Sequence, residues 1–482
     1  MKNWNVRKIV LAHEDMPEHH RLARSLSWPH LVALGVGAIV GTGILTLIGV
    51  GAAKAGPSVI LSFAIAGLIC ACAALAYAEM ATMIPASGSA YTYSYVVFGE
   101  LIAWIVGWSL ILEYSLVVSA VAVGWSGYAA GFLTSVGAGL PAALTNGPEL
   151  GGVFNLPAVF IIAAVAALLS AGTRESATLN AVLVVVKMLA LALFIVVALH
   201  SFNAANFHPF MPNGFSSHMG VGVDGKPVEV GVMAAAAIIF FAFYGFDAIA
   251  TAAEEAKDPT RDLAIGIVGS MVACVAIYMA VAAAAIGALA YTRFADSPEP
   301  LALILREIGQ GWAARILGLS AVIALPTVIL AFLFGQSRIF FTMARDGLLP
   351  QSLARVSKRG TPVRITIFTA IVVAIIAALF PLNEIAALAN AGTLTAFVAV
   401  CAAMLTMRRR EPGRERRFRT PAPWLIGTVG ILGCAYLFWS LPVKTQTYFL
   451  GWNLFGLLVY ALYGAGRAEQ ARAASGVPAA PR

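Results

Sequence analysis

The sequence is poor in charged residues and in cysteine. Only 11% of its 482 residues are charged and 60% are hydrophobic, whereas soluble globular proteins have about 25% charged residues, too large a difference for a water-exposed surface of this size. The five cysteines form no Cys-x-x-Cys pair, so neither a disulfide framework nor a zinc site is indicated. The formal net charge of +8 comes from residues between long apolar runs, which indicates membrane orientation and not nucleic acid binding. We interpret the chain as an integral membrane protein.

Motifs of enzymes, pumps and channels are also missing. The sequence has no phosphate-binding P-loop motif, no cluster of His, Asp or Cys that could bind a metal or act as a nucleophile, and no repeated filter sequence. None of the seven histidines lies in the middle of an apolar run, which argues against a histidine proton relay. We therefore expect a carrier without a metal or cofactor, and not an enzyme.

Twelve apolar segments are long enough to cross a bilayer, which requires about 20 residues each. They cover residues 31–53, 57–79, 99–129, 154–172, 177–201, 231–254, 263–291, 316–340, 365–380, 385–406, 422–442 and 446–465. The predicted fold is an all-α membrane protein with twelve transmembrane helices. The connections predicted inside contain 23 Lys and Arg residues and those outside contain six, so both termini are predicted to be cytoplasmic in the inner (plasma) membrane. The basic run from Arg408 to Arg419 is expected to contact anionic lipids.

Two spans do not suit a continuous helix. The first has four glycines within residues 35–43, and the sixth places Gly245 and Asp247 near the middle of the bilayer. Close helix packing explains isolated glycines, and an Asp that caps a half-helix explains Asp247, but the cap already requires a break. The two spans are five helices apart, so the halves that contain them have opposite orientations. Interrupted spans at corresponding positions of inverted repeats predict a transporter binding site.

An interrupted helix offers free backbone groups of both polarities. Amides at the start of its second half can hold an anion, and carbonyls at the end of its first half can hold a cation. Because an α-amino acid has both charges one carbon apart, it is the substrate that such a site suits.

Three motifs resemble one family. They are Gly37 to Ile44, Phe240 to Asp247 followed by 253–259, and Gly335 to Arg338 followed by 344–350. Together they resemble the amino acid–polyamine–organocation superfamily, in particular its cationic amino acid transporter branch and the bacterial relatives of that branch. The resemblance covers about residues 24–465.

The resemblance implies a five-plus-five inverted-repeat core of the leucine-transporter type and amino acid transport by alternating access, typically coupled to protons. The repeats would be 31–201 and 231–406, with two extra spans in 422–465 and cytoplasmic segments 1–30 and 466–482. The substrate carboxylate would meet amides of the first interruption, the amine would meet carbonyls of both, and Phe241 would be an aromatic gate. The implied substrate-binding residues are Ile39, Gly41, Thr42, Gly43, Phe241, Ala242, Tyr244 and Gly245.

The sequence departs from the family pattern in the eighth span and at the second interruption. Pro326 lies in the middle of the eighth span, and Tyr244 is bulkier than the aliphatic residue expected there. The turn after the sixth span ends with Ala264 where the family usually has Pro. Substrate choice is therefore the property least constrained by the resemblance.

Three charged residues lie in the middle of predicted spans, and such residues are functional candidates. Lys187 either forms an ion pair with Glu113 or, as the resemblance supports, places its ammonium against the unwound part of the first span, where sodium-dependent relatives bind sodium. In the second case it couples proton movement to closure of the site. Glu113 either transfers a proton or holds the third span in place, and Asp247 is the third coupling candidate.

The predicted function is a proton-coupled amino acid symporter. Small or medium neutral amino acids are favoured because no acidic side chain other than Asp247 accompanies the pocket motifs. An amino acid/amine exchanger and a cationic amino acid transporter on the same fold remain alternatives. The expected partners are the amino acid, protons and membrane lipids, and no oligomeric state follows from the sequence.

Overall fold

The computed structural model describes residues 6–8, 26–86, 88–170, 177–222, 225, 227–253, 256–295, 297–350 and 363–467. Most of the predicted cytoplasmic segment 1–30 and of the predicted tail 466–482 lies outside the described residues. The described chain is mainly helical, with a two-stranded antiparallel sheet formed by β1 (His218–Val221) and β2 (Pro227–Val230).

The helices follow the chain in an order that matches the predicted spans. The first half contains α1 (Trp28–Ile39), α2 (Thr42–Leu45), α3 (Leu47–Ala55), α4 (Val59–Met83), α5 (Ser89–Val97), α6 (Glu100–Ser135), α7 (Ala142–Thr145), α8 (Leu156–Ser170) and α9 (Ala177–Leu199). The second half contains α10 (Val232–Ile239), α11 (Asp247–Thr251), α12 (Pro259–Ala288), α13 (Pro300–Glu307), α14 (Gly311–Ala324), α15 (Pro326–Arg345), α16 (Val363–Leu379), α17 (Leu382–Arg410), α18 (Pro423–Trp439) and α19 (Val443–Val459).

Nine helical stretches among the described residues are long and apolar enough to cross a membrane. They are Trp28–Leu45, Leu47–Met83, Glu100–Ser135, Ala181–Leu199, Val232–Thr251, Pro259–Ala288, Gly311–Arg345, Leu382–Arg410 and Val443–Arg467. The apolar helices α8, α16 and α18 are shorter, with 15 to 17 residues, and lie where the fourth, ninth and eleventh spans were predicted. A multi-span α-helical membrane protein is therefore confirmed, while the count of twelve and the division into two repeats stay predictions.

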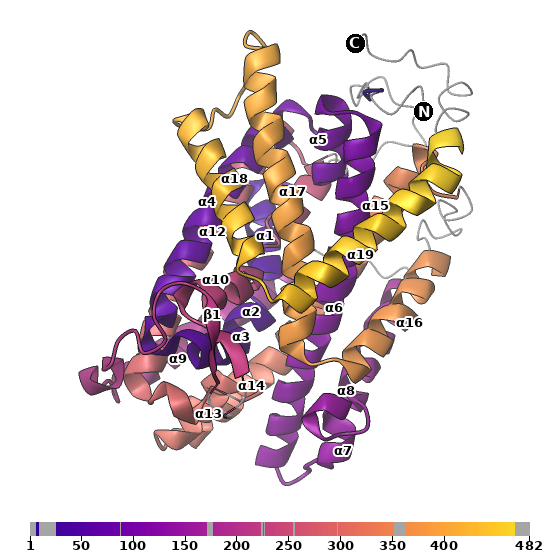
Figure 1. The fold of residues 1–482 in the computed structure, drawn as a ribbon. Helices are drawn as coiled ribbons and strands as arrows, with labels where there is room; N and C mark the ends of the chain where they lie inside the picture. Colours follow the sequence, from indigo (N-terminus) through magenta and orange to yellow (C-terminus); the bar gives the residue numbers. More distant parts are fainter. Residues whose placement is uncertain are drawn as a thin grey trace.

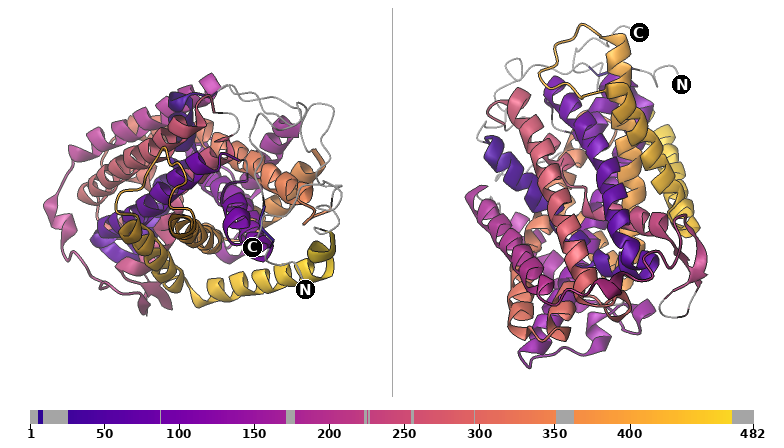
Figure 2. Two further views of the ribbon diagram at one scale, coloured as in Figure 1. Left: turned by 90° about the horizontal axis from the view of Figure 1, so that it is seen from above. Right: turned by 90° about the vertical axis from the view of Figure 1, so that its left-hand side faces the viewer.

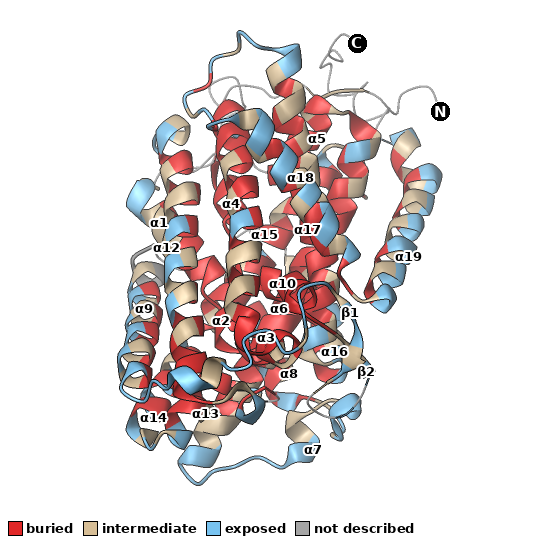
Figure 3. Ribbon diagram, turned by 60° about the vertical axis from the view of Figure 1, so that its left-hand side comes forward, coloured by how far each residue is buried: buried red, intermediate tan, exposed pale blue. Residues whose placement is uncertain are grey.

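Burial follows the pattern of a protein surrounded by lipid. Every residue of α10 is buried, and α2, α3 and α10 lie in the interior of the bundle (Figure 3). The outer faces of peripheral helices expose large apolar side chains, such as Phe160 on α8 and Leu462 after α19. The last long helix, α19, runs along the outside of the bundle (Figures 1 and 2). Apolar exposure of this kind is stable only in a hydrocarbon solvent.

The predicted inside and outside connections separate to opposite ends of the bundle. At one end Lys8 pairs with Asp346, and the guanidinium groups of Arg410 and Arg414 donate to the carbonyls of Val97 and Met83. At the other end the amide of Gly231 donates to the carbonyl of Lys54. The predicted topology requires this separation.

Both predicted interruptions are present. Helix α1 ends at Ile39, and the extended residues Val40 and Gly41 precede α2. Helix α10 ends at Ile239, continues as one tight turn, η6 (Phe240–Ala242), and turns at Gly245, whose φ of 118° disfavours any residue with a side chain, before α11 begins. Only the second break needs glycine for its backbone conformation, because Gly245 has a positive φ while Val40 and Gly41 do not.

Candidate substrate site

The two interruptions contact each other directly. A Cβ atom at Gly43 would lie 2.3 Å from the Cα atom of Ala242, and one at Gly245 would lie 3.0 Å from the carbonyl carbon of Ala38. Backbone therefore meets backbone where the two broken spans cross, deep in the buried interior. Glycine is required at both positions for close approach.

The first interruption leaves amides without partners. The amides of Gly41, Thr42 and Gly43, all predicted to hold a carboxylate, donate to no acceptor in the described part of the chain, although all three residues are buried. The Thr42 hydroxyl is separate from them and donates to the carbonyl of Val121 on α6 at 3.4 Å. Because unpaired buried amides are rare, three in succession indicate a site for an anionic group.

The backbone carbonyls at the two interruptions differ in whether they already accept a hydrogen bond. No described donor reaches the carbonyls of Phe241, Ala242 or Tyr244, as the predicted ammonium site requires. The Ile39 carbonyl instead accepts a hydrogen bond of 2.8 Å from the hydroxyl of Tyr278 on α12. Ile39 thus lies at the site, but one lone pair of its carbonyl oxygen already accepts a hydrogen bond. Sequence analysis missed Tyr278, although a tyrosine within a predicted transmembrane span was a visible signal.

A further cap was also missed at the end of α10. The side-chain amide of Asn390 on α17 donates to the carbonyls of Ala237 and Ile238 at 2.7 and 3.1 Å. Asn390 is fully buried, and these bonds satisfy carbonyls that the end of α10 frees from its own helix. The second interruption is therefore held from outside by a side chain 152 residues away in sequence.

Apolar side chains surround the free backbone groups. A Cβ atom at Gly41 would make ordinary contacts of 3.5 Å with Val328 and 3.9 Å with Leu325, which lie at the junction of α14 and α15. The rings of Phe241 and Tyr244 pack edge to face with centroids 5.0 Å apart, and both are buried. The position of Phe241 is compatible with the predicted gate, and the walls near Gly41 are hydrophobic.

Lys187 lies against the first interruption. Its ammonium donates to the carbonyl of Gly37 at 3.0 Å and to the hydroxyl of Thr327 at 3.1 Å, and the side chain is buried. The Gly37 carbonyl is available because the amide of Gly41 does not bond to it. The alternative ion pair with Glu113 is absent among the described contacts, because neither carboxyl oxygen of Glu113 has a hydrogen-bond partner.

Thr327 lies just after a break between two helices at Pro326. Helix α14 ends at Ala324 and α15 begins at Pro326, which has no amide hydrogen. The Thr327 hydroxyl donates to the Ala324 carbonyl at 2.7 Å, so its lone pairs are free to accept from Lys187. Pro326, where the sequence departs from the family pattern, therefore directly precedes a residue that contacts the lysine.

Asp247 bonds a backbone amide freed by the second interruption, but among the described contacts it makes no capping bond to α11, of which it is the first residue. Its carboxylate accepts a hydrogen bond of 2.8 Å from the hydroxyl of Tyr114 and one of 3.1 Å from the amide of Gly245. It thereby links the start of α11 to Gly245 and to Tyr114 of α6. Glu113, next to Tyr114 on α6, is as deeply buried as Asp247 but has no such bonds.

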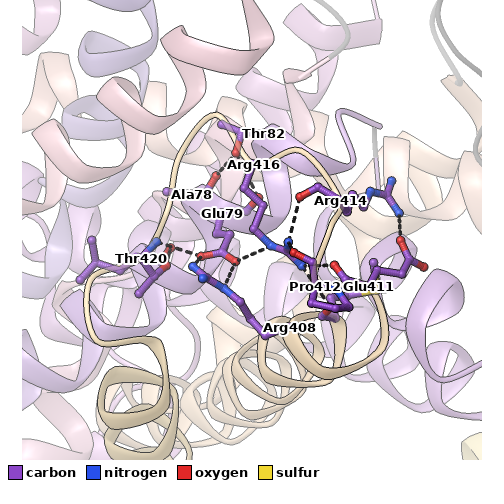
Figure 4. A network of polar contacts seen from close by, with 11 residues as sticks. Ala78, Glu79, Thr82, Arg408, Glu411, Pro412, Arg414, Arg416 and Thr420 are labelled. Atoms are coloured by element: carbon purple, nitrogen blue, oxygen red, sulfur yellow. Dashed lines mark hydrogen bonds and ion pairs between the residues drawn. The ribbon is translucent and has the colours of Figure 1, made fainter.

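A buried ion-pair network closes the end of the bundle where the basic run lies (Figure 4). The guanidinium of Arg408 binds both carboxylate oxygens of Glu79 at 2.7 Å, and Arg416 approaches the same carboxylate at 3.3 Å. The amide of Thr420 adds a bond of 2.8 Å. Two arginines of the run expected to contact lipid therefore turn into the protein, while Arg409 and Arg417 are exposed.

The chain is similar to known permeases over nearly its whole length. The profile of the family described as "Amino acid permease" matches residues 26–464. The branched-chain amino acid permease BcaP of Bacillus subtilis (strain 168) is 44% identical over 92% of this chain and 93% of its own. The methylthioribose transporter of the same organism is 41% identical over 92% and 94%, and the vacuolar cationic amino acid transporter 2 of Arabidopsis thaliana is 38% identical over 85% and 64%.

Proposed function

The chain belongs to the amino acid permease family, and we propose that it is a secondary active transporter that carries an amino acid together with a proton. Membership of the family makes it a multi-pass membrane transporter and not an enzyme. The proposal places it in the plasma membrane with both termini cytoplasmic and has it work by alternating access. Its twelve spans would form a five-plus-five core with repeats 31–201 and 231–406.

The proposed substrate is a zwitterion held by backbone groups. Its carboxylate accepts from the amides of Gly41, Thr42 and Gly43, and its ammonium donates to the carbonyls of Phe241, Ala242 and Tyr244. One observation supports this arrangement: buried amides and buried carbonyls that have no partner among the described residues lie on the two sides of the contact between Gly43 and Ala242. Leaving a buried polar group unpaired costs about 1–3 kcal/mol, so a ligand that pairs several of them gains affinity.

Small to medium neutral amino acids, including branched-chain ones, are the proposed substrate class. Val328 and Leu325 form an apolar wall beside Gly41, and such a wall favours an aliphatic side chain. The relative that is 44% identical is named a branched-chain amino acid permease, which agrees with this wall.

Lys187 is the proposed coupling residue. When charged, its ammonium joins the freed Gly37 carbonyl of the first interruption to Thr327 of α15. Loss of the proton removes the charge from this junction and weakens both hydrogen bonds, so protonation at Lys187 favours the closed arrangement. Asp247 supports coupling indirectly because its carboxylate fixes the second interruption against Tyr114.

The test is uptake by the purified full chain in proteoliposomes with an imposed pH gradient, acidic outside. We expect saturable accumulation of L-leucine above equilibrium that collapses when a protonophore removes the gradient. Uptake that needs amino acid on the opposite side and ignores the gradient would replace symport by exchange. The absence of flux for all twenty amino acids would contradict the proposed substrate.

A further inference from the structure

Glu113 is a buried acid whose carboxyl group has no hydrogen-bond partner in the described part of the chain. Its side chain is 1% exposed, and neither carboxyl oxygen accepts a hydrogen bond from the described residues. The Tyr244 hydroxyl and the Asn390 amide oxygen are also buried and unpaired among those residues. Buried polar groups without partners are candidates for binding a ligand, a proton or both.

These groups lie on elements that meet beside the second interruption. Thr393 of α17 lies next to both Glu113 and Tyr244 without completing a hydrogen bond to either, and its own hydroxyl donates to the Ala389 carbonyl. Asn390 is one turn before Thr393 on α17, so it projects from the same side of the helix. We call Glu113, Tyr244, Asn390 and Thr393 the Glu113 cluster.

The surroundings of Glu113 contain no cation among the described residues. Asp247 is its one charged neighbour, and Tyr77 of α4, Tyr114 of α6 and Tyr244 are the neighbouring groups that can titrate. On the α17 side its neighbour is backbone, since a Cβ atom at Gly392 would lie 3.1 Å from the Cβ atom of Glu113. A charged carboxylate in such a place is unfavourable unless a proton or another cation neutralises it.

Tyr244 connects this cluster to the proposed substrate site. Its backbone carbonyl is one of the free acceptors proposed for the substrate ammonium, while its ring extends to the neighbourhood of Glu113. Tyr244 therefore links a carbonyl of the proposed substrate site to the Glu113 cluster. The side chain of lysine is about as long as that of tyrosine, so a substrate with a terminal cation is the ligand to consider for Glu113.

From this geometry, and on the basis of the proposed function, we propose that Glu113 is a charge-compensating subsite that binds either a proton or the cationic side chain of the substrate. With a neutral amino acid Glu113 keeps its proton, which crosses the membrane with the substrate in addition to the proton coupled through Lys187. With a cationic amino acid the proton leaves Glu113 for water and the substrate cation forms an ion pair with the carboxylate. The net charge at the subsite is the same in both cases, and a cationic substrate moves with one proton fewer.

The experiment compares L-leucine with L-lysine in proteoliposomes of the full chain, with radiolabelled flux and an internal pH dye recorded together. We expect lysine to compete with leucine and to be transported, and the number of protons per lysine to be one lower than the number per leucine. This measurement uses the wild-type protein and does not depend on the folding of a variant. Equal proton numbers for the two substrates, or failure of lysine to compete, would overturn the inference while leucine symport still stood.

A variant then assigns the effect to Glu113. Glu113→Gln should weaken lysine transport at least about tenfold, because a buried charge loses its partner, and should leave leucine transport with one proton fewer. Glu113→Asp should restore part of the lysine transport, and Glu384→Gln, which changes an acid paired with Lys444, should change neither substrate. Lysine transport by Glu113→Gln at the wild-type rate would contradict the assignment. If the wild-type protein transports neither amino acid, the proposed function fails together with this inference.

Discussion

The ammonium of Lys187 and the carbonyl oxygen of Gly37, 150 residues apart in the chain, are joined by a hydrogen bond of 3.0 Å. The carbonyl is free because the first broken span does not continue through Gly41. The charge on one helix is thus linked to the shape of the site on another, which connects proton binding to substrate binding in the proposed mechanism.

Replacing Lys187 tests this link. We expect Lys187→Met to lose gradient-driven accumulation of leucine at least about tenfold, because residue 187 can then neither bind a proton nor offer a charge to Gly37 and Thr327. Thr327→Val removes one of the acceptors of the Lys187 ammonium but leaves the proton-binding lysine in place. It should therefore slow uptake but preserve the dependence of uptake on the pH gradient. Accumulation by Lys187→Met at the normal rate under the imposed gradient would eliminate Lys187 as the coupling residue.

The contact between the interruptions predicts a contrast between two glycines. Gly43→Ala would place its Cβ 2.3 Å from the Cα atom of Ala242, which the backbone cannot accept without moving, while Gly41→Ala meets side chains at 3.5 Å or more. We expect Gly43→Ala to lower stability by about 1–3 kcal/mol and to abolish leucine-dependent thermal stabilisation. Gly41→Ala should fold like the wild type. Thermal unfolding in detergent with and without leucine measures both, and equal behaviour of the two variants would contradict the observed contact.

Replacing Arg408, which pairs with Glu79, by a neutral residue should lower the stability of the protein strongly. Arg408→Gln removes the bidentate partner of a fully buried carboxylate, and breaking a buried ion pair costs about 3–5 kcal/mol. We expect a clear fall in the thermal unfolding temperature. The matched control is Arg417→Gln, since Arg417 pairs with Glu415 at an exposed site where ion pairs contribute little. If both variants lost the same stability, the network would not be what holds this end of the bundle.

Glu299 predicts a dependence of stability on pH. It precedes α13, outside the candidate membrane spans, and burial raises the pKa of its carboxyl above the ordinary value, an effect that Arg306 at 2.5 Å opposes. The folded state therefore binds a proton more tightly than the unfolded state. The contribution of Glu299 to stability is fully present below the ordinary glutamate pKa of about 4.3. It is lost as the pH rises through the raised pKa of the folded state.

Glu299→Gln checks this sign, because glutamine stays neutral at every pH. Relative to the wild type, the variant should gain stability as pH rises through that window and lose this advantage in acid. Unfolding temperatures recorded over a pH series measure the difference. A constant difference between the two proteins across the series would show that Glu299 does not titrate there.

The sequence by itself determined the class of fold and the places where it breaks. Long apolar runs force helices in a membrane, since only intrahelical bonds satisfy the backbone there, and glycine-rich segments or a mid-span Asp mark where that pattern fails. Gly41, Gly43 and Gly245 were identified on this basis because the signal is local. The freedom of the amides and carbonyls around them follows from the same local breaks.

The partners of these groups were decided only by the tertiary structure. Tyr278 on Ile39, Asn390 on the end of α10, Thr327 on Lys187 and two arginines on Glu79 are contacts between residues 140 or more positions apart. A polar side chain in an apolar helix has to find a partner, but the sequence does not say which helix will face it. Packing selects that helix, and the same packing left Glu113 buried among neighbours that do not neutralise it.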